Sequence, residues 1–81
     1  MMEAFVLIVT RPGYEERIVN ALKGNPRVKE VYRVYGEYDV IIRVEVEDLE
    51  GLDDFHDYLR RIGGIETTET LIASSRGART S

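Results

Sequence analysis

The segment Val40-Ile41-Ile42-Arg43-Val44-Glu45-Val46-Glu47 is the clearest β-strand in the sequence, and it decides the fold class. Its even-numbered residues are apolar, and its odd-numbered residues from Arg43 onward are charged, as in a strand with one buried face. The turn Gly36-Glu37-Tyr38-Asp39 precedes it, and the apolar-rich run Val28 to Tyr35 precedes the turn. We therefore predict an antiparallel hairpin, and the irregular alternation of residues 28–35 indicates an edge strand or a β-bulge.

A helix is predicted on each side of this hairpin. The first spans about Tyr14–Lys23 and ends at Gly24-Asn25-Pro26, and the second begins after the N-cap Asp48 and runs to about Arg61. Each helix carries an apolar stripe at helical spacing. The expected buried residues are Tyr14, Ile18, Ala21 and Leu22 in the first helix, and Leu49, Leu52, Phe55, Leu59 and Ile62 in the second.

Two outer strands, Ala4–Val9 and Ile65–Ala73, complete a βαββαβ order. Two right-handed split β-α-β units give an α+β, ferredoxin-like fold, in which both helices cover one face of a four-stranded antiparallel sheet. The first strand is apolar on both faces, so the uncovered face should also be apolar. We place Ala4, Val6, Ile8 and Ile41 on that bare face and expect it to pack on the sheet of a second subunit.

Size and composition agree with a need for subunit contacts. The chain has 81 residues, no Cys and one His. These numbers indicate a single domain over residues 1–74, with a loose tail at residues 75–81, and they argue against disulfides, thiolate zinc or a histidine metal cluster. We predict no metal site and no cofactor. A core this small usually needs outside stabilisation, and oligomerisation is the means that remains.

The charge balance narrows the possible partners. The chain has 11 Lys and Arg against 15 Asp and Glu, a net charge of −4, which is the wrong sign for a protein that grips phosphates. We therefore expect no direct contact with nucleic acid. The apolar run Ala4–Val9 is far shorter than the ~20 residues of a membrane span, so we expect no membrane association and a cytoplasmic location.

The hairpin turn and the last strand carry the most informative chemistry. Gly36 allows close access to backbone N–H groups that can bind a carboxylate, and Asp39 can accept hydrogen bonds from an ammonium group. Thr68 and Thr70 share one face of the last strand and can add hydroxyls. This set suits a zwitterionic amino acid. The alternative interpretation is purely structural: a hairpin glycine, a turn-capping aspartate and threonines as ordinary strand formers.

Other candidate groups have simpler explanations. His56 lies beside the apolar stripe of the second helix, as expected for a histidine at the margin of a core. The acidic residues at the start of that helix lack the ligand spacing of a calcium loop and suit a solvated face near the positive helix end. They are Asp48, Glu50, Asp53, Asp54 and Asp57. No nucleophile elbow or phosphate loop is present, and nothing in the sequence argues for an enzyme.

Two motifs resemble those of a known family. The run Val34-Tyr35-Gly36-Glu37-Tyr38-Asp39-Val40-Ile41-Ile42-Arg43-Val44 resembles the V-x-G-x-Y-D-x-x-x-x-V signature of the effector domain of Lrp/AsnC regulators, called the RAM domain. Thr67-Thr68-Glu69-Thr70 resembles the S/T-T-x-T pattern of its final strand. The similarity spans residues 3–73.

The resemblance implies a domain that dimerises through its sheet, with dimers assembling into octamer- or decamer-like rings. It also implies an amino acid effector bound between subunits. Gly36, Tyr38 and Asp39 would hold the main-chain groups of the effector, while Thr68 and Thr70 would approach from a neighbouring subunit. Tyr35 stands where a small Thr or Ser is common in the family, so its ring would line or partly fill the pocket.

The resemblance further implies a stand-alone form. Full-length members carry an N-terminal helix-turn-helix domain, whereas this chain begins three residues before its first strand. We expect an effector module that modulates the transcription of amino acid metabolism indirectly, by mixing with full-length Lrp/AsnC regulators. Two alternatives remain open: a pure assembly partner that binds no ligand, and an enzyme on the similar dimeric α/β-barrel architecture with His56 and a carboxylate in a cleft.

Overall fold

The computed structural model of the chain describes residues 1–74 and contains the six predicted elements in the predicted order. Their bounds are β1 Met2–Thr10, α1 Glu15–Lys23, β2 Val28–Arg33, β3 Val40–Val46, α2 Leu49–Ile62 and β4 Ile65–Ile72. Strand β2 ends at Arg33, two residues before the predicted end at Tyr35. The tail predicted at residues 75–81 lies outside the described residues.

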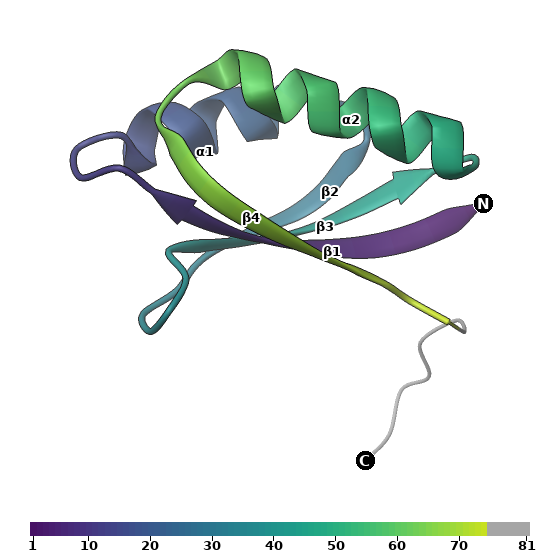
Figure 1. Cartoon of the computed structure of the whole chain (residues 1–81), viewed down its shortest axis with the longest axis horizontal. Coiled ribbons are helices and arrows are strands. Elements are labelled where there is room, and N and C mark those ends of the chain that lie inside the picture. Colours follow the sequence, from purple (N-terminus) through teal and green to yellow (C-terminus); the bar gives the residue numbers. More distant parts are fainter. Residues whose placement is uncertain (75–81) are drawn as a thin grey trace.

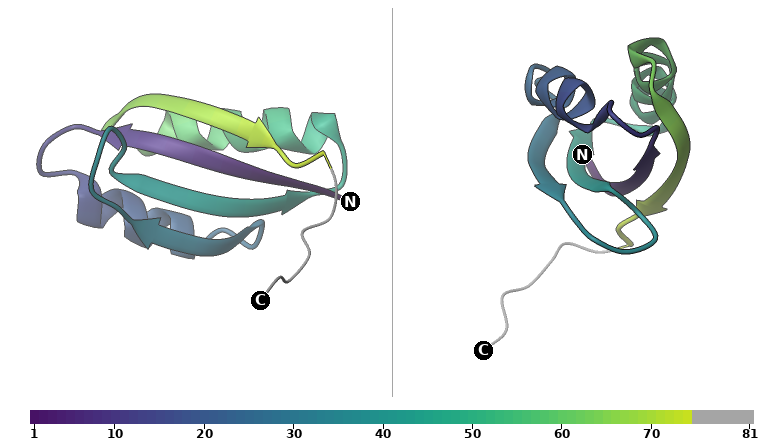
Figure 2. Two further views of the ribbon diagram at one scale, coloured as in Figure 1. Left: turned by 90° about the horizontal axis from the view of Figure 1, so that it is seen from below. Right: turned by 90° about the vertical axis from the view of Figure 1, so that its left-hand side faces the viewer.

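The strands form one antiparallel sheet in the order β2-β3-β1-β4. Both helices lie on the same side of this curved sheet (Figures 1 and 2). The arrangement confirms the α+β, ferredoxin-like prediction. Strand β2 is an edge strand, and its register against β3 shifts between Val28 and Glu30, so the edge position and the irregularity were both predicted correctly.

The core lies between the helices and the sheet, and it corrects the predicted orientation of β1. Val6 pairs with Ile42, and residues opposite each other in antiparallel strands share a face. Because the even-numbered residues of β3 face the helices, Ala4, Val6 and Ile8 do so too and are fully buried. Placing these three residues on the bare face was therefore wrong. Both faces of β1 are apolar, so only its register against β3 could decide its orientation.

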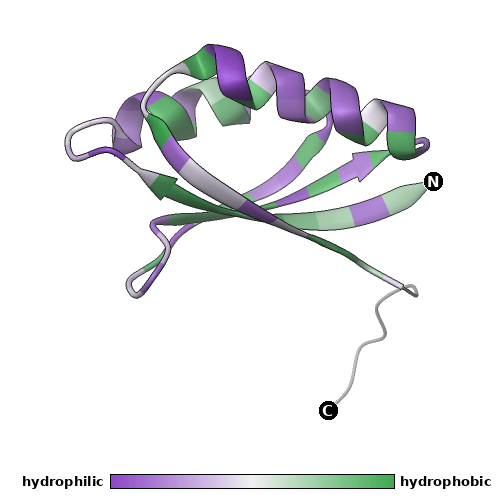
Figure 3. Ribbon diagram, in the orientation of Figure 1, coloured by the Kyte–Doolittle hydropathy of each residue, from purple (hydrophilic) through white to green (hydrophobic). Residues whose placement is uncertain are grey.

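The helices bury most of their predicted stripes. Figure 3 shows a largely hydrophilic outer surface on α2. The helical core residues are Ile18, Val19, Leu22, Leu52, Phe55 and Leu59. Val19 was not predicted, whereas Tyr14 and Leu49 were predicted to be buried and are exposed by 39% and 60%. Leu49 is the first residue of α2, and the buried side of the helix begins about one turn later, at Leu52.

Local sequence signals determine where α2 begins and where it ends. The Asp48 side chain accepts a hydrogen bond from the Gly51 N–H at 2.9 Å, which confirms the predicted N-cap. After the helix, Gly63 and Gly64 both adopt positive φ, at 79° and 86°. At Gly64 the ring of Tyr14 also approaches the backbone closely, because a Cβ built there would lie 2.4 Å from Tyr14 Cδ1.

No described segment other than the β2–β3 turn lies over the sheet surface opposite the helices, which we call the open face (Figure 2). The pairing register places on it Glu3, Phe5, Leu7 and Val9 of β1, Glu30 and Tyr32 of β2, Ile41, Arg43 and Glu45 of β3, and Thr67, Glu69 and Leu71 of β4. Phe5 is 37% exposed and Leu71 49% exposed, so apolar side chains meet water here. Within residues 1–74, no helix is long and apolar enough to cross a membrane.

Candidate functional site

The β2–β3 turn is closed at its base and open at its tip. The Val34 N–H donates to the Asp39 carbonyl at 3.0 Å, and the Asp39 N–H donates to the Ile8 carbonyl at 2.9 Å. At the tip, Gly36 has φ +143°, and a Cβ added there would meet no atom within 4 Å. The turn therefore presents exposed backbone at Gly36 on a base anchored to β1, as an anion-binding turn requires.

The Asp39 carboxylate stabilises the end of β1. Its Oδ2 accepts from the Thr10 backbone N–H at 2.8 Å and lies 3.2 Å from the Thr10 hydroxyl. Thr10 is the one buried polar side chain of the part of the chain that the structure describes, at 5% exposure. The Asp39 carboxylate thus has a structural role at the end of β1, and it does not cap its own turn as the structural interpretation predicted. Its Oδ1 makes no hydrogen bond within residues 1–74, so the carboxylate also retains a free acceptor.

The two tyrosines of the turn behave differently. The Tyr38 hydroxyl donates to the Glu69 carboxylate on β4, which ties the turn to the open face. That hydrogen bond to Glu69 raises the pKa of Tyr38, because deprotonation would place two negative charges side by side. Tyr35 is fully exposed, so within one subunit its ring neither lines nor fills the turn.

Thr68 and Thr70 lie on the helix side of β4, since they pair with Ile8 and Val6. Their shared face was therefore predicted correctly. Thr70 Oγ1 and His56 Nε2 share a hydrogen bond of 2.7 Å, which sequence reasoning did not anticipate. The turn reaches β4 only on the open face, through Tyr38 and Glu69, and no hydrogen bond within residues 1–74 joins either threonine to residues 35–39. A single subunit does not bring the two predicted halves of the site together.

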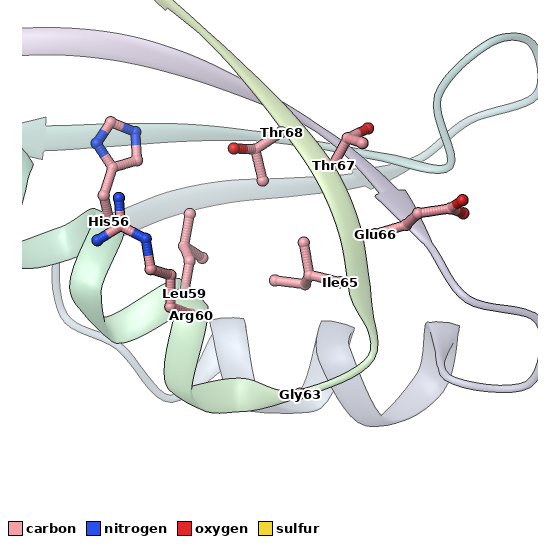
Figure 4. Close-up of a pocket in the computed structure, with 8 residues that line it drawn as sticks. All are labelled: His56, Leu59, Arg60, Gly63, Ile65, Glu66, Thr67 and Thr68. Carbon is pink, nitrogen blue, oxygen red and sulfur yellow. The ribbon is translucent and has the colours of Figure 1, made fainter.

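Between α2 and β4 lies a hollow of about 280 Å³ (Figure 4). Its lining residues are His56, Leu59, Arg60, Gly63, Ile65, Glu66, Thr67 and Thr68. The sequence analysis missed this hollow, because its walls come from two elements whose distance depends on how α2 packs. The only local signal was the i, i+4 spacing of His56 and Arg60, which places both on one helix face.

His56 is half-buried at the edge of the core, as predicted, and it also faces this hollow. This position in a hollow is compatible with the enzyme alternative. However, its hydrogen bond goes to a threonine hydroxyl, and the one carboxylate that lines the hollow, on Glu66, points away from it (Figure 4). Within residues 1–74, no carboxylate is hydrogen-bonded to His56 to orient it for general acid–base catalysis.

A charged cluster occupies the open face. The Arg43 guanidinium contacts three carboxylates at 2.8 Å, those of Glu3, Glu30 and Glu45, and so connects β1, β2 and β3. These hydrogen bonds raise the pKa of Arg43, and the bond from Arg43 lowers the pKa of Glu30. The cluster carries an excess of negative charge. In the described residues, no group of three or more His, Cys, Asp and Glu side chains is arranged to hold a metal ion.

Comparisons with known proteins place this geometry in context. Residues 3–80 match a family described as the Lrp/AsnC ligand binding domain. The HTH-type transcriptional regulator FL11 of Pyrococcus horikoshii is 32% identical over 71 residues, which are 88% of this chain and 47% of FL11. The chain thus spans about half the length of the curated regulator that it matches.

Two further matches cover very different shares of the matched proteins. The crystal structure of FFRP-DM1 is 44% identical, with a TM-score of 0.86, and the match covers 90% of this chain and 99% of that one. The homocitrate synthase of Sulfurisphaera tokodaii is 32% identical over 59 residues, which are 73% of this chain but 13% of the enzyme. The similarity to the enzyme is therefore confined to a small part of it.

Proposed function

Because the chain belongs to the family of Lrp/AsnC ligand binding domains, we propose that it is an amino-acid-binding, oligomerising effector module. In this proposal it modulates the transcription of amino acid metabolism genes through partner proteins that contact DNA. The observation that carries this proposal is the β2–β3 turn, in which an exposed glycine backbone at Gly36 lies beside a carboxylate oxygen of Asp39 that has no hydrogen-bond partner in residues 1–74. These are the groups that an α-carboxylate and an α-ammonium require.

We propose that the binding site is completed between subunits. Gly36, Tyr38 and Asp39 of one subunit hold the main-chain groups, and Thr68 and Thr70 of another approach the bound molecule. Support comes from the placement of these two groups on opposite faces of the sheet within one chain, since the threonines face the helices and the turn reaches β4 on the open face, at Glu69. Tyr35 is fully exposed and free to contact the effector or a neighbouring subunit. Effector binding then shifts the assembly by its different affinity for two arrangements of the subunits.

We propose that DNA contacts are made by partners, which are full-length Lrp/AsnC regulators. FL11 is an HTH-type transcriptional regulator that this chain matches over about half of its length, and FFRP-DM1 is matched over nearly its whole length. The net charge of −4 opposes direct binding of this chain to phosphates. Such a module would work in the cytoplasm and would not be an enzyme, in agreement with its similarity to ligand-binding domains and transcriptional regulators.

A thermal-shift screen with the twenty amino acids tests the proposed effector. A ligand at a hundredfold excess over its Kd adds about 2.7 kcal/mol of stability, which raises Tm measurably. Asp39→Asn should abolish the response, because it removes the charge that binds the ammonium group, while the amide oxygen of the asparagine can still accept from the Thr10 N–H. Asp53→Asn, an exposed change on α2, is the matched control. If no amino acid raises Tm at millimolar concentration, the proposal fails.

The alternative is a pure assembly partner, and the apolar part of the open face favours it because that surface needs no ligand. In this case the chain should join a full-length Lrp/AsnC regulator to the same extent with and without amino acids. Size-exclusion chromatography of the mixture, with and without the amino acid that gives the largest thermal shift, distinguishes the two proposals. Co-elution that changes with the ligand contradicts the assembly-only proposal.

A further inference from the structure

The hollow between α2 and β4 has an apolar floor and a polar wall. Leu59 and Ile65 project into it from the helix and the strand, as Figure 4 shows. Its volume of about 280 Å³ is far above the ~30 Å³ of one water molecule and near the lower end of small-molecule pockets. It has room for the side chain of an amino acid and is too small for a large cofactor.

The polar groups that line the hollow include one cation, Arg60, and hydroxyls that can donate or accept hydrogen bonds. The Arg60 guanidinium extends along α2 towards the ring of His56, and the Thr68 hydroxyl faces them from β4 (Figure 4). The bond between His56 and Thr70 fixes the imidazole ring in place. The Glu66 carboxylate points away from the hollow, and the helix and strand therefore turn a cation and a hydroxyl towards the same space.

Arg60 retains donors for a ligand. Its Nη1 donates to Asp57 one turn earlier on the exposed side of α2, and this is its only hydrogen bond within residues 1–74. The guanidinium has five N–H donors in a planar fork that matches a carboxylate. An ion pair this exposed contributes little stability, so Arg60 can take a second carboxylate without a large loss.

We propose that this hollow receives the side chain of the effector, and that Arg60 selects a side chain that ends in a carboxylate. The inference rests on the proposed function and names its effector class: an amino acid with an acidic side chain, aspartate or glutamate. The methylene groups would lie on Leu59 and Ile65, and the carboxylate would bind Arg60 and Thr68. Charge-assisted pairs are about twice as strong as neutral ones, so a carboxamide would bind more weakly.

Isothermal titration calorimetry with the full chain tests this proposal, using glutamate, aspartate, glutamine, asparagine and leucine. Glutamate or aspartate should bind at least tenfold more tightly than its amide. Arg60→Met keeps the length of the side chain and removes its charge, so it should abolish this preference. Arg61→Met is the matched control, because Arg61 is exposed on the same turn and does not line the hollow.

The outcomes separate this inference from the proposed function. If leucine or an amide binds as tightly as the acids, or if Arg60→Met leaves the preference intact, the inference is wrong while an effector site at Asp39 still stands. If Arg60→Met weakens all five ligands equally, the hollow binds the α-carboxylate and the selectivity proposal is also wrong. If none of the twenty amino acids binds, both proposals fail together.

Discussion

At the scale of single residues, the clearest constraint lies at Gly64. Its φ is 86°, and the ring of Tyr14 also lies where a Cβ would be. Gly64→Ala should lower the free energy of unfolding by about 2–4 kcal/mol, because left-handed strain and overpacking add. Gly13→Ala is the matched control, since Gly13 has φ 88° but open space around it, and it should lose only about 1–2 kcal/mol. Urea unfolding at equal protein concentration measures both. Equal losses would show that the Tyr14 ring moves aside.

At the scale of elements, Arg43 joins three strands through Glu3, Glu30 and Glu45. Arg43→Met should lower Tm at neutral pH, because it leaves these carboxylates close together without their cation. Since the pKa of Glu30 is lowered in the fold, its contribution is present above its unfolded pKa and is lost as the pH falls through the lowered value. The difference in Tm between wild type and Arg43→Met should therefore shrink on acidification. A difference in Tm that stays constant with pH contradicts the role of the cluster. Arg61→Met is the control for the loss of one surface charge.

At the scale of the whole molecule, the open face needs a partner surface, and we propose that a second copy supplies it. Light scattering should give a mass of at least twice the 9.3 kDa subunit. Leu71→Glu places a charge on the open face and should yield monomers, since burying an unpaired carboxylate is unfavourable. Leu49→Glu is the control, because Leu49 is at least as exposed but lies on α2, so this variant should remain a dimer or larger. A monomeric wild type, or equal masses for the two variants, contradicts the proposal.

The sequence by itself determined the identity and order of the elements. Alternation in Val40–Glu47, the Asp48 cap and the glycines after each helix are local signals that act over a few residues, and the structure confirms what they predicted. The same signals located the hairpin turn and its Asp39. They also placed Thr68 and Thr70 on one face of β4, because side chains along a strand alternate with a period of two.

Only the tertiary structure decided which groups meet. Strand β1 is apolar on both faces, so its pairing with β3, and not its composition, directs Ala4, Val6 and Ile8 into the core. Asp39 bonds Thr10 across 29 positions, and Thr70 meets His56 across 14. The hollow beside Arg60 likewise depends on where α2 rests on the sheet. Such contacts follow from strand register and helix packing, which are set by the burial of the whole core and leave no pattern at any one position in the chain.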